Sequence, residues 1–216
     1  MFGVTEQKKV VVRPHRLDGI GFDLLVVGSR NDNSQKILDV ESFWSDADAS
    51  IKNDMPSVVK DFGLQRQSAS VVLPHSSYSH FTMNRPNVPV EELRSSLFWA
   101  AQEKLDNLPY HTPLLDSCFA PELLQGREHN KMHVFVAEES HVRGCVDSIK
   151  KSSLRVKMVT VHEIAMNELL REWSSGSLLA YIDVPVKESP SLILVLDGCF
   201  VAYKKLPSIN LDCPKD

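Results

Sequence analysis

The chain has 216 residues, of which 43% are hydrophobic and 24% are charged, a composition typical of a soluble globular protein. Its formal net charge of −4 gives no overall positive field, so nucleic acid is excluded as a first expectation for a partner. No apolar run approaches the roughly 20 residues that span a bilayer, and the N-terminus lacks the apolar segment of a secretion signal. We therefore expect a cytoplasmic protein that does not insert directly into the membrane.

Valine-rich strands and one helix are predicted in the first third of the chain. The strands are expected at residues 9–13, 23–27 and 37–44. A helix is expected over residues 50–62, because apolar side chains recur there at helical spacing and Gly63 suits the position just after a helix end. Pro56 fits the first turn of that helix.

The strongest helix prediction lies in the middle of the chain, after strands expected at 70–73 and 80–83. Pro89 suits the first helical position, and the glutamates that follow Val90 favour the positive end of the helix dipole. Apolar residues then recur at helical spacing through the end of the segment. They are Leu93, Leu97, Ala100, Ala101 and Leu105.

Strands and helices alternate in the second half of the chain, which favours an α/β sheet with helices packed on it. The expected strands are 114–120, 133–137, 155–159, 178–183, 192–196 and 200–205. Helices are expected over 139–150 and from a capping box at Thr160 and Glu163 to about Trp173. Asp197-Gly198 predicts a type I′ hairpin turn.

The three strands after residue 177 form a meander that no predicted helix covers. A doubly wound domain would cover such a sheet. The pattern therefore predicts an exposed sheet edge near residues 192–205, which needs a partner or risks aggregation.

An ordered string of motifs runs through the middle of the sequence. It consists of Val71-Val72-Leu73-Pro74, Ser77-Tyr78, the segment 85–93 that reads RPNVPVEEL, Phe98-Trp99 and Leu115-Asp116. This string resembles the PilM-like family of type IV pilus biogenesis proteins, and in particular its branch from the mannose-sensitive haemagglutinin (MSHA) pilus, MshI. The same order of elements continues downstream, so that the resemblance covers about residues 20–206.

The resemblance implies an α/β, actin-like and ribonuclease-H-like fold with a small inserted α/β subdomain. The first lobe would comprise residues 1–65 and 131–175, the insert residues 66–130, and the beginning of an incomplete second lobe residues 176–216. Proteins of this family lie at the inner face of the cytoplasmic membrane. There they bind the short cytoplasmic tail of a membrane-anchored pilus protein, so a non-catalytic assembly scaffold is expected.

A nucleotide-binding actin-like ATPase is the alternative. In such folds, Asp18 and Asp183 would be the paired acids that hold magnesium through water, and Gly19 would open the first phosphate loop. The expected serine or threonine loop does not follow Gly19, and Pro185 removes a backbone donor from the second loop. A turn aspartate and a strand-end aspartate are the simpler interpretation, so we expect no ATP or magnesium cofactor and no ATP hydrolysis.

Other chemistry finds little support in the sequence. His129 and His133 have the i, i+4 spacing of helical metal ligands, but their segment leads into a strand, so surface histidines are expected and no metal site. Cys145 and Cys199 are expected to be small apolar residues rather than catalytic thiols. A ribonuclease-H-like nuclease would require clustered acids at strand ends, and the acids here are isolated.

Phe98 and Trp99 are the candidates for partner binding. Adjacent helical residues point about 100° apart, so the two rings cannot both face one narrow core. Packing of both in the core is the first expectation. An apolar groove beside this helix that receives a peptide is the second.

Overall fold

The computed structural model describes residues 7–14, 22–29, 35–43, 55–119, 131–171, 173–183 and 190–207. The chain divides into two compact units. Unit 1 comprises residues 1–80, 88–116 and 135–162. Unit 2 comprises residues 81–87, 117–134 and 163–216.

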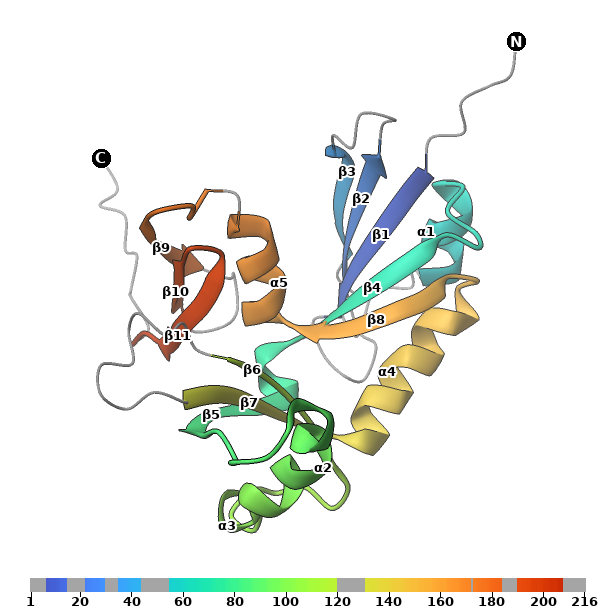
Figure 1. The fold of residues 1–216 in the computed structure, drawn as a ribbon. Helices are drawn as coiled ribbons and strands as arrows, with labels where there is room; N and C mark the ends of the chain where they lie inside the picture. Colours follow the sequence, from blue (N-terminus) through green and yellow to red (C-terminus); the bar gives the residue numbers. More distant parts are fainter. Residues whose placement is uncertain are drawn as a thin grey trace. The chain divides into compact units, whose positions relative to one another are not determined.

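A five-stranded sheet with the order β3-β2-β1-β4-β8 forms the centre of unit 1 (Figure 1). Its strands are β1 (Gln7–Pro14), β2 (Phe22–Ser29), β3 (Gln35–Phe43), β4 (Ser68–Leu73) and β8 (Arg155–Val161). The first three strands pair antiparallel, whereas β4 is parallel to both β1 and β8. Alternate residues of β1 and β2, such as Val10, Val12 and Leu24, point into the core, as a period of two requires.

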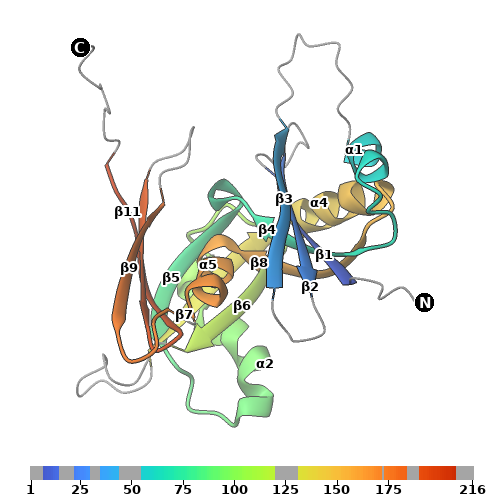
Figure 2. The same ribbon diagram turned by 90° about the horizontal axis from the view of Figure 1, so that it is seen from above.

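Helices α1 (Met55–Asp61) and α4 (Glu139–Lys151) supply the other half of this core. Val58 and Val59 of α1 join Cys145 and Ile149 of α4 in one cluster with the buried strand residues. Figure 2 shows both helices beside the five-stranded sheet. Gly63 follows α1 with φ of +60°, which confirms its predicted role at the helix end.

A second, three-stranded sheet has the order β5-β7-β6. Its strands are β5 (Tyr78–Asn84), β7 (Lys131–Glu138) and β6 (Pro113–Phe119), and a 3₁₀ turn, η1 (His75–Ser77), precedes β5. Each strand crosses the boundary between the two units along the chain. The expected ranges assigned β4 to the insert and β7 to the first lobe. The ladders instead place β4 in the five-stranded sheet and β7 in this one, and the division into lobes itself stays a prediction.

The helix expected to run through residue 105 is interrupted at Ala101. Helix α2 (Val90–Ala100) ends there and a short α3 (Gln102–Leu105) follows, because Ala101 has φ of −95° and ψ of −2°. Of the residues predicted at helical spacing, Leu93, Leu97, Ala101 and Leu105 are buried, whereas Ala100 is exposed. The apolar pattern therefore located the buried side of the segment, although the helix is not continuous.

Unit 2 contains the meander β9 (Leu178–Asp183), β10 (Ser191–Leu196) and β11 (Cys199–Lys205), with most of α5 (His162–Leu170). Asp197 and Gly198 have φ of +49° and +73°, which confirms the predicted type I′ turn between β10 and β11. The Asn167 side-chain amide donates to the Gly198 carbonyl over 3.0 Å, so α5 is attached to this hairpin.

The predicted capping box at Thr160 is wrong. Thr160 lies inside β8, and α5 begins only at His162. The side chain of Glu163 is fully buried instead of capping an exposed helix start. Among the described residues, none of the helices combines the length and hydropathy of a membrane-spanning segment.

Candidate functional site

Helix α2 presents two aromatic rings to solvent. Leu93 and Leu97 are 8% and 2% exposed and form its buried side. Phe98 is 38% exposed and Trp99 is 75% exposed, so the expectation that both rings pack in the core is wrong. Neither ring belongs to the buried side of the helix that Leu93 and Leu97 form, which explains why both rings are exposed.

The two rings contact each other at the surface. Their centroids are 5.7 Å apart and their planes meet at 89°, the edge-to-face arrangement that aromatic rings prefer. Glu91 and Glu92 lie exposed in the first turn of the same helix. Helix α2 therefore offers an apolar aromatic pair at one end and negative charge at the other. We call this the aromatic surface of α2.

The segment after α3 is fixed to the sheet by polar contacts. The carboxylate of Glu138, at the end of β7, accepts hydrogen bonds from the backbone N–H of His111 over 2.7 Å and of Thr112 over 3.1 Å. The Glu139 N–H donates to the Thr112 carbonyl over 2.9 Å, and the hydroxyls of Ser79 and Tyr110 are 3.1 Å apart. These bonds anchor the segment that leads from the helices to β6, as a rigid binding surface requires.

Backbone hydrogen bonds also set the charge of Glu138. The N–H of Thr112 and then that of His111 hold the pKa of this carboxyl below its ordinary value of 4.5, although its burial acts in the opposite direction. Because the folded-state pKa is depressed, the stabilisation is fully present above pH 4.5 and is lost as the pH falls through the lowered pKa.

Replacement of Glu138 by glutamine should therefore destabilise the protein at neutral pH and matter less in acid. Urea unfolding of the two proteins at pH 7 and at successively lower pH checks this, with Glu103→Gln on α3 as a control for an exposed acid. A difference in stability that stays constant below pH 4.5 would contradict the assigned role of the Glu138 carboxylate.

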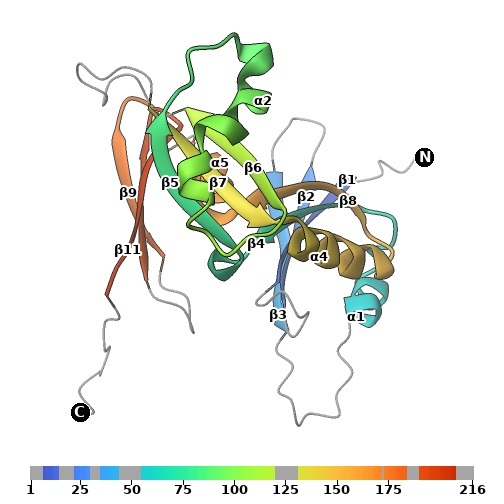
Figure 3. The same cartoon turned by 90° about the horizontal axis from the view of Figure 1, so that it is seen from below.

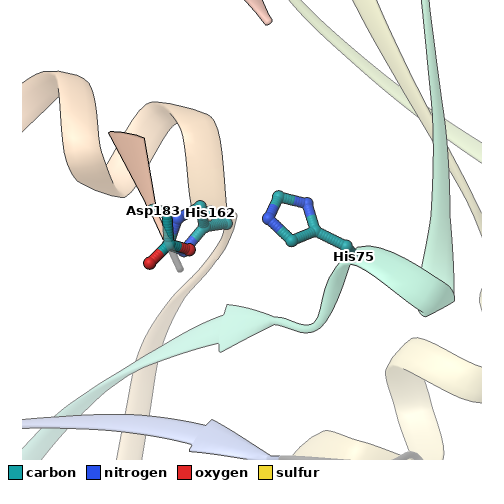
Figure 4. Close-up of side chains that lie close together, drawn as sticks. All are labelled: His75, His162 and Asp183. Atoms are coloured by element: carbon teal, nitrogen blue, oxygen red, sulfur yellow. The ribbon is translucent and has the colours of Figure 1, made fainter. Parts of the chain in front are cut away.

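Two buried histidines lie at the carboxyl ends of β4 and β8 (Figure 4). His75 follows β4 and His162 follows β8, and their ring centroids are 4.7 Å apart. His75 Nδ1 lies 2.9 Å from the hydroxyl of Tyr78. Neutral imidazole nitrogens are common zinc ligands, and unit 1 contributes these two to a candidate ligand set.

His75 and His162 are not among the residues predicted for a functional site. Each comes directly after a strand or its proline exit, in Leu73-Pro74-His75 and Val161-His162. The carboxyl ends of neighbouring parallel strands meet at one edge of a sheet, where α/β folds place ligands. The signal was present, but it required knowledge that β4 and β8 are parallel neighbours.

The structure does not test the predicted pairing of Asp18 with Asp183, because Asp18 and Gly19 lie outside the described residues. Asp183 is the last residue of β9 in unit 2, half-buried and opposite Ser191 of β10. Their pairing around magnesium remains a hypothesis.

His133 is buried at 2% exposure, and its ring lies 4.5 Å from that of Phe200. The expectation that it is a surface residue is therefore wrong, because β7 is the central strand of its sheet and is covered on both faces. His129 lies outside the described residues.

The thiols differ in their surroundings. Cys145 lies in the core of unit 1, where burial raises its pKa to about 11, so it stays protonated and unreactive at neutral pH. This supports its interpretation as a small apolar residue. Cys199, which was expected to behave in the same way, is exposed at the start of β11.

Two solved structures share the fold of this chain. A chain of the PilM–PilN type IV pilus biogenesis complex superposes with a TM-score of 0.66 at 15% identity, covering 94% of this chain and 61% of that one. The cytoplasmic domain of EpsL, an inner-membrane component of the type II secretion system of Vibrio cholerae, superposes with a TM-score of 0.58 at 11% identity, covering 92% and 71%. No protein-family model matches the sequence, and no curated protein is significantly similar to it.

These likenesses confirm the predicted α/β fold class, since the chain shares the fold of both superposed chains. The chain spans about three fifths of the length of the matched PilM–PilN chain. At such low sequence identity, the similarity shows the fold alone and says nothing about activity or partners.

Proposed function

We propose that this protein is a non-catalytic scaffold in the assembly of a type IV pilus, at the cytoplasmic face of the inner membrane. In this role, it binds the short cytoplasmic tail of a membrane-anchored pilus or secretion protein. The observation that carries the proposal is the exposed aromatic pair of Phe98 and Trp99 on α2. The assembly context is supported by the fold shared with a chain of the PilM–PilN complex and with the EpsL cytoplasmic domain.

An MSHA-type pilus is the more specific form of this proposal. It rests on the ordered string of motifs from Val71 to Asp116, in which the segment RPNVPVEEL opens α2. The same helix carries the aromatic surface, so the motif and the proposed binding site coincide.

The chemistry of the aromatic surface of α2 suits a basic, partly apolar peptide. Cytoplasmic segments next to a membrane span are enriched in lysine and arginine. Such a peptide could place an apolar residue on the rings of Phe98 and Trp99 and a basic residue near Glu91 and Glu92. The net charge of −4 favours the approach of a basic tail at low ionic strength.

The absence of catalysis is part of the proposal. Pro185 stands where a phosphate loop needs a backbone donor. Cys145 is protonated and enclosed in the core. The aromatic surface of α2 contains no nucleophile paired with a base, as covalent catalysis would require.

Thermal unfolding of the full chain tests the scaffold against the ATPase. The ligands are synthetic tail peptides of single-span pilus and secretion proteins, their scrambled versions, and millimolar Mg-ATP. A ligand at 100 times its Kd stabilises the folded state by about 2.7 kcal/mol, which raises the midpoint by about 5–10 °C for a chain of this size. We expect a tail peptide to cause this rise and Mg-ATP to cause none. A rise with Mg-ATP alone would overturn the proposal in favour of a nucleotide-binding protein.

A further inference from the structure

The meander sheet of unit 2 has one buried face and one apolar face, which is exposed along β9 and half-buried along β10. Ile193, Val195 and Phe200 are buried and form the inner face, and the hydrogen bond from Asn167 ties α5 to the hairpin that carries them. The opposite side chains form the face that we call the outer face. They are Leu178, Ala180 and Ile182 of β9, Leu192, Leu194 and Leu196 of β10, and Ala202 of β11.

The ladder places these side chains in rows across the sheet. Ile182 lies beside Leu192, Ala180 beside Leu194, and Leu178 beside Leu196. Leu178 and Ile182 are 58% and 57% exposed. The three adjacent rows form one contiguous apolar patch rather than single scattered side chains, and the largest such patch on a protein surface is often functional. Figure 3 shows the three strands in orange and red, with β9 and β11 on either side of the meander.

The dimensions of the outer face favour a single helix as its occupant. Strands of six residues are about 20 Å long, and three strands span about 14 Å, so the face measures about 300 Å². A helix of about 14 residues is about 21 Å long and 10–12 Å wide, which matches the face. One helix docked on this face would bury about 600 Å² in total from both partners, the size of a weak, transient interface rather than of a permanent one.

Charge argues against a second copy as the occupant. The one charged side chain of the outer face, among the described residues, is Lys204, which pairs with Leu192 at a corner. The face carries no carboxylate that a second copy could bring to this lysine. A partner helix with an apolar stripe and an acidic residue at one end would complement both the leucine rows and Lys204.

We propose that the outer face of the meander sheet is a second docking surface, which binds one amphipathic helix of a partner protein with acidic residues beside its apolar stripe. This surface is distinct from the aromatic surface of α2, and the inference does not depend on the proposed tail binding. The sequence predicted an exposed sheet edge near residues 192–205. Among the described residues, β11 is an edge strand of the meander sheet, whereas β10 is its central strand.

The probe is a labelled 14-residue amphipathic peptide with a leucine stripe flanked by glutamates, together with a version in which lysines replace the glutamates. Fluorescence anisotropy with the full chain should show tighter binding of the acidic peptide. Ala180→Glu, which puts a charge in the middle row, should weaken that binding at least tenfold. Lys204→Glu should weaken the binding of the acidic peptide about three- to fivefold and strengthen the binding of the basic peptide. Lys157→Glu, which changes an exposed lysine of β8, serves as the matched control.

Cys199 provides a second readout, because it is exposed and lies opposite Leu196 at the rim of the outer face. Bound peptide should slow its alkylation, as followed by mass spectrometry of the peptide that contains it. Phe98→Ala/Trp99→Ala should leave the binding of the acidic peptide unchanged, which separates this proposal from the tail site. Equal binding of both peptides, indifference to Lys204→Glu, or a sedimenting dimer that Ala180→Glu dissociates would overturn it.

Discussion

Replacing Phe98 and Trp99 together by alanine should lower the affinity for the tail peptide by about a hundredfold or more. Large aromatic side chains at the centre of an interface commonly contribute 2 kcal/mol or more each, and 2.7 kcal/mol corresponds to about a hundredfold in Kd. The two rings contact each other, so the single substitutions should not add up to the double one. Isothermal calorimetry with the tail peptide gives the three affinities.

The fold should tolerate this change, because both rings lie outside the core. Trp173→Ala is the matched control, since Trp173 is 67% exposed in unit 2 and lies outside the aromatic surface of α2. It should leave tail binding unaffected. Unchanged binding by the double variant, or an equal loss in the Trp173 variant, would place the tail elsewhere.

Ile149→Ala should lower the free energy of unfolding by about 2–5 kcal/mol. Ile149 is 1% exposed and belongs to the core cluster that joins α4 to the five-stranded sheet, with Val59 and Val71 among its members. Its truncation removes apolar contacts and leaves a cavity that rigid strands cannot close. Urea unfolding measures the loss.

Ile182→Ala is the matched control for this core substitution. Ile182 is 57% exposed on β9, so its truncation should change stability by no more than about 0.5 kcal/mol. A loss below 1 kcal/mol for Ile149→Ala would show that α4 does not pack on the sheet as described.

The regular elements could be predicted because their sequence periods are clear. The valines of β1 alternate between core and surface, and Leu93, Leu97 and Leu105 recur at helical spacing and are all buried. The Asp197-Gly198 turn was also predictable, since few dipeptides accept two positive φ angles in succession. These features depend on residues close together in the sequence.

The features that could not be predicted from the sequence depend on residues that are far apart in the chain. The burial of His133 follows from the central position of β7 between β5 and β6, which local periodicity does not reveal. The approach of His75 and His162 requires β4 and β8 to pair in parallel across more than 80 residues. Phe98 and Trp99 were expected in the core because their apolarity is visible in the sequence, whereas the side of α2 that faces the sheet is set by the leucines beside them.

The indole N–H resonances give the most direct test of tail binding at α2. The chain has three tryptophans, and Trp99→Phe assigns the resonance of Trp99 in the nitrogen–proton spectrum. On titration with the tail peptide, we expect the Trp99 indole signal to shift with saturation while that of Trp173 stays in place. A peptide that binds and leaves Trp99 unmoved, or a family of tail peptides none of which binds, would contradict the proposed scaffold.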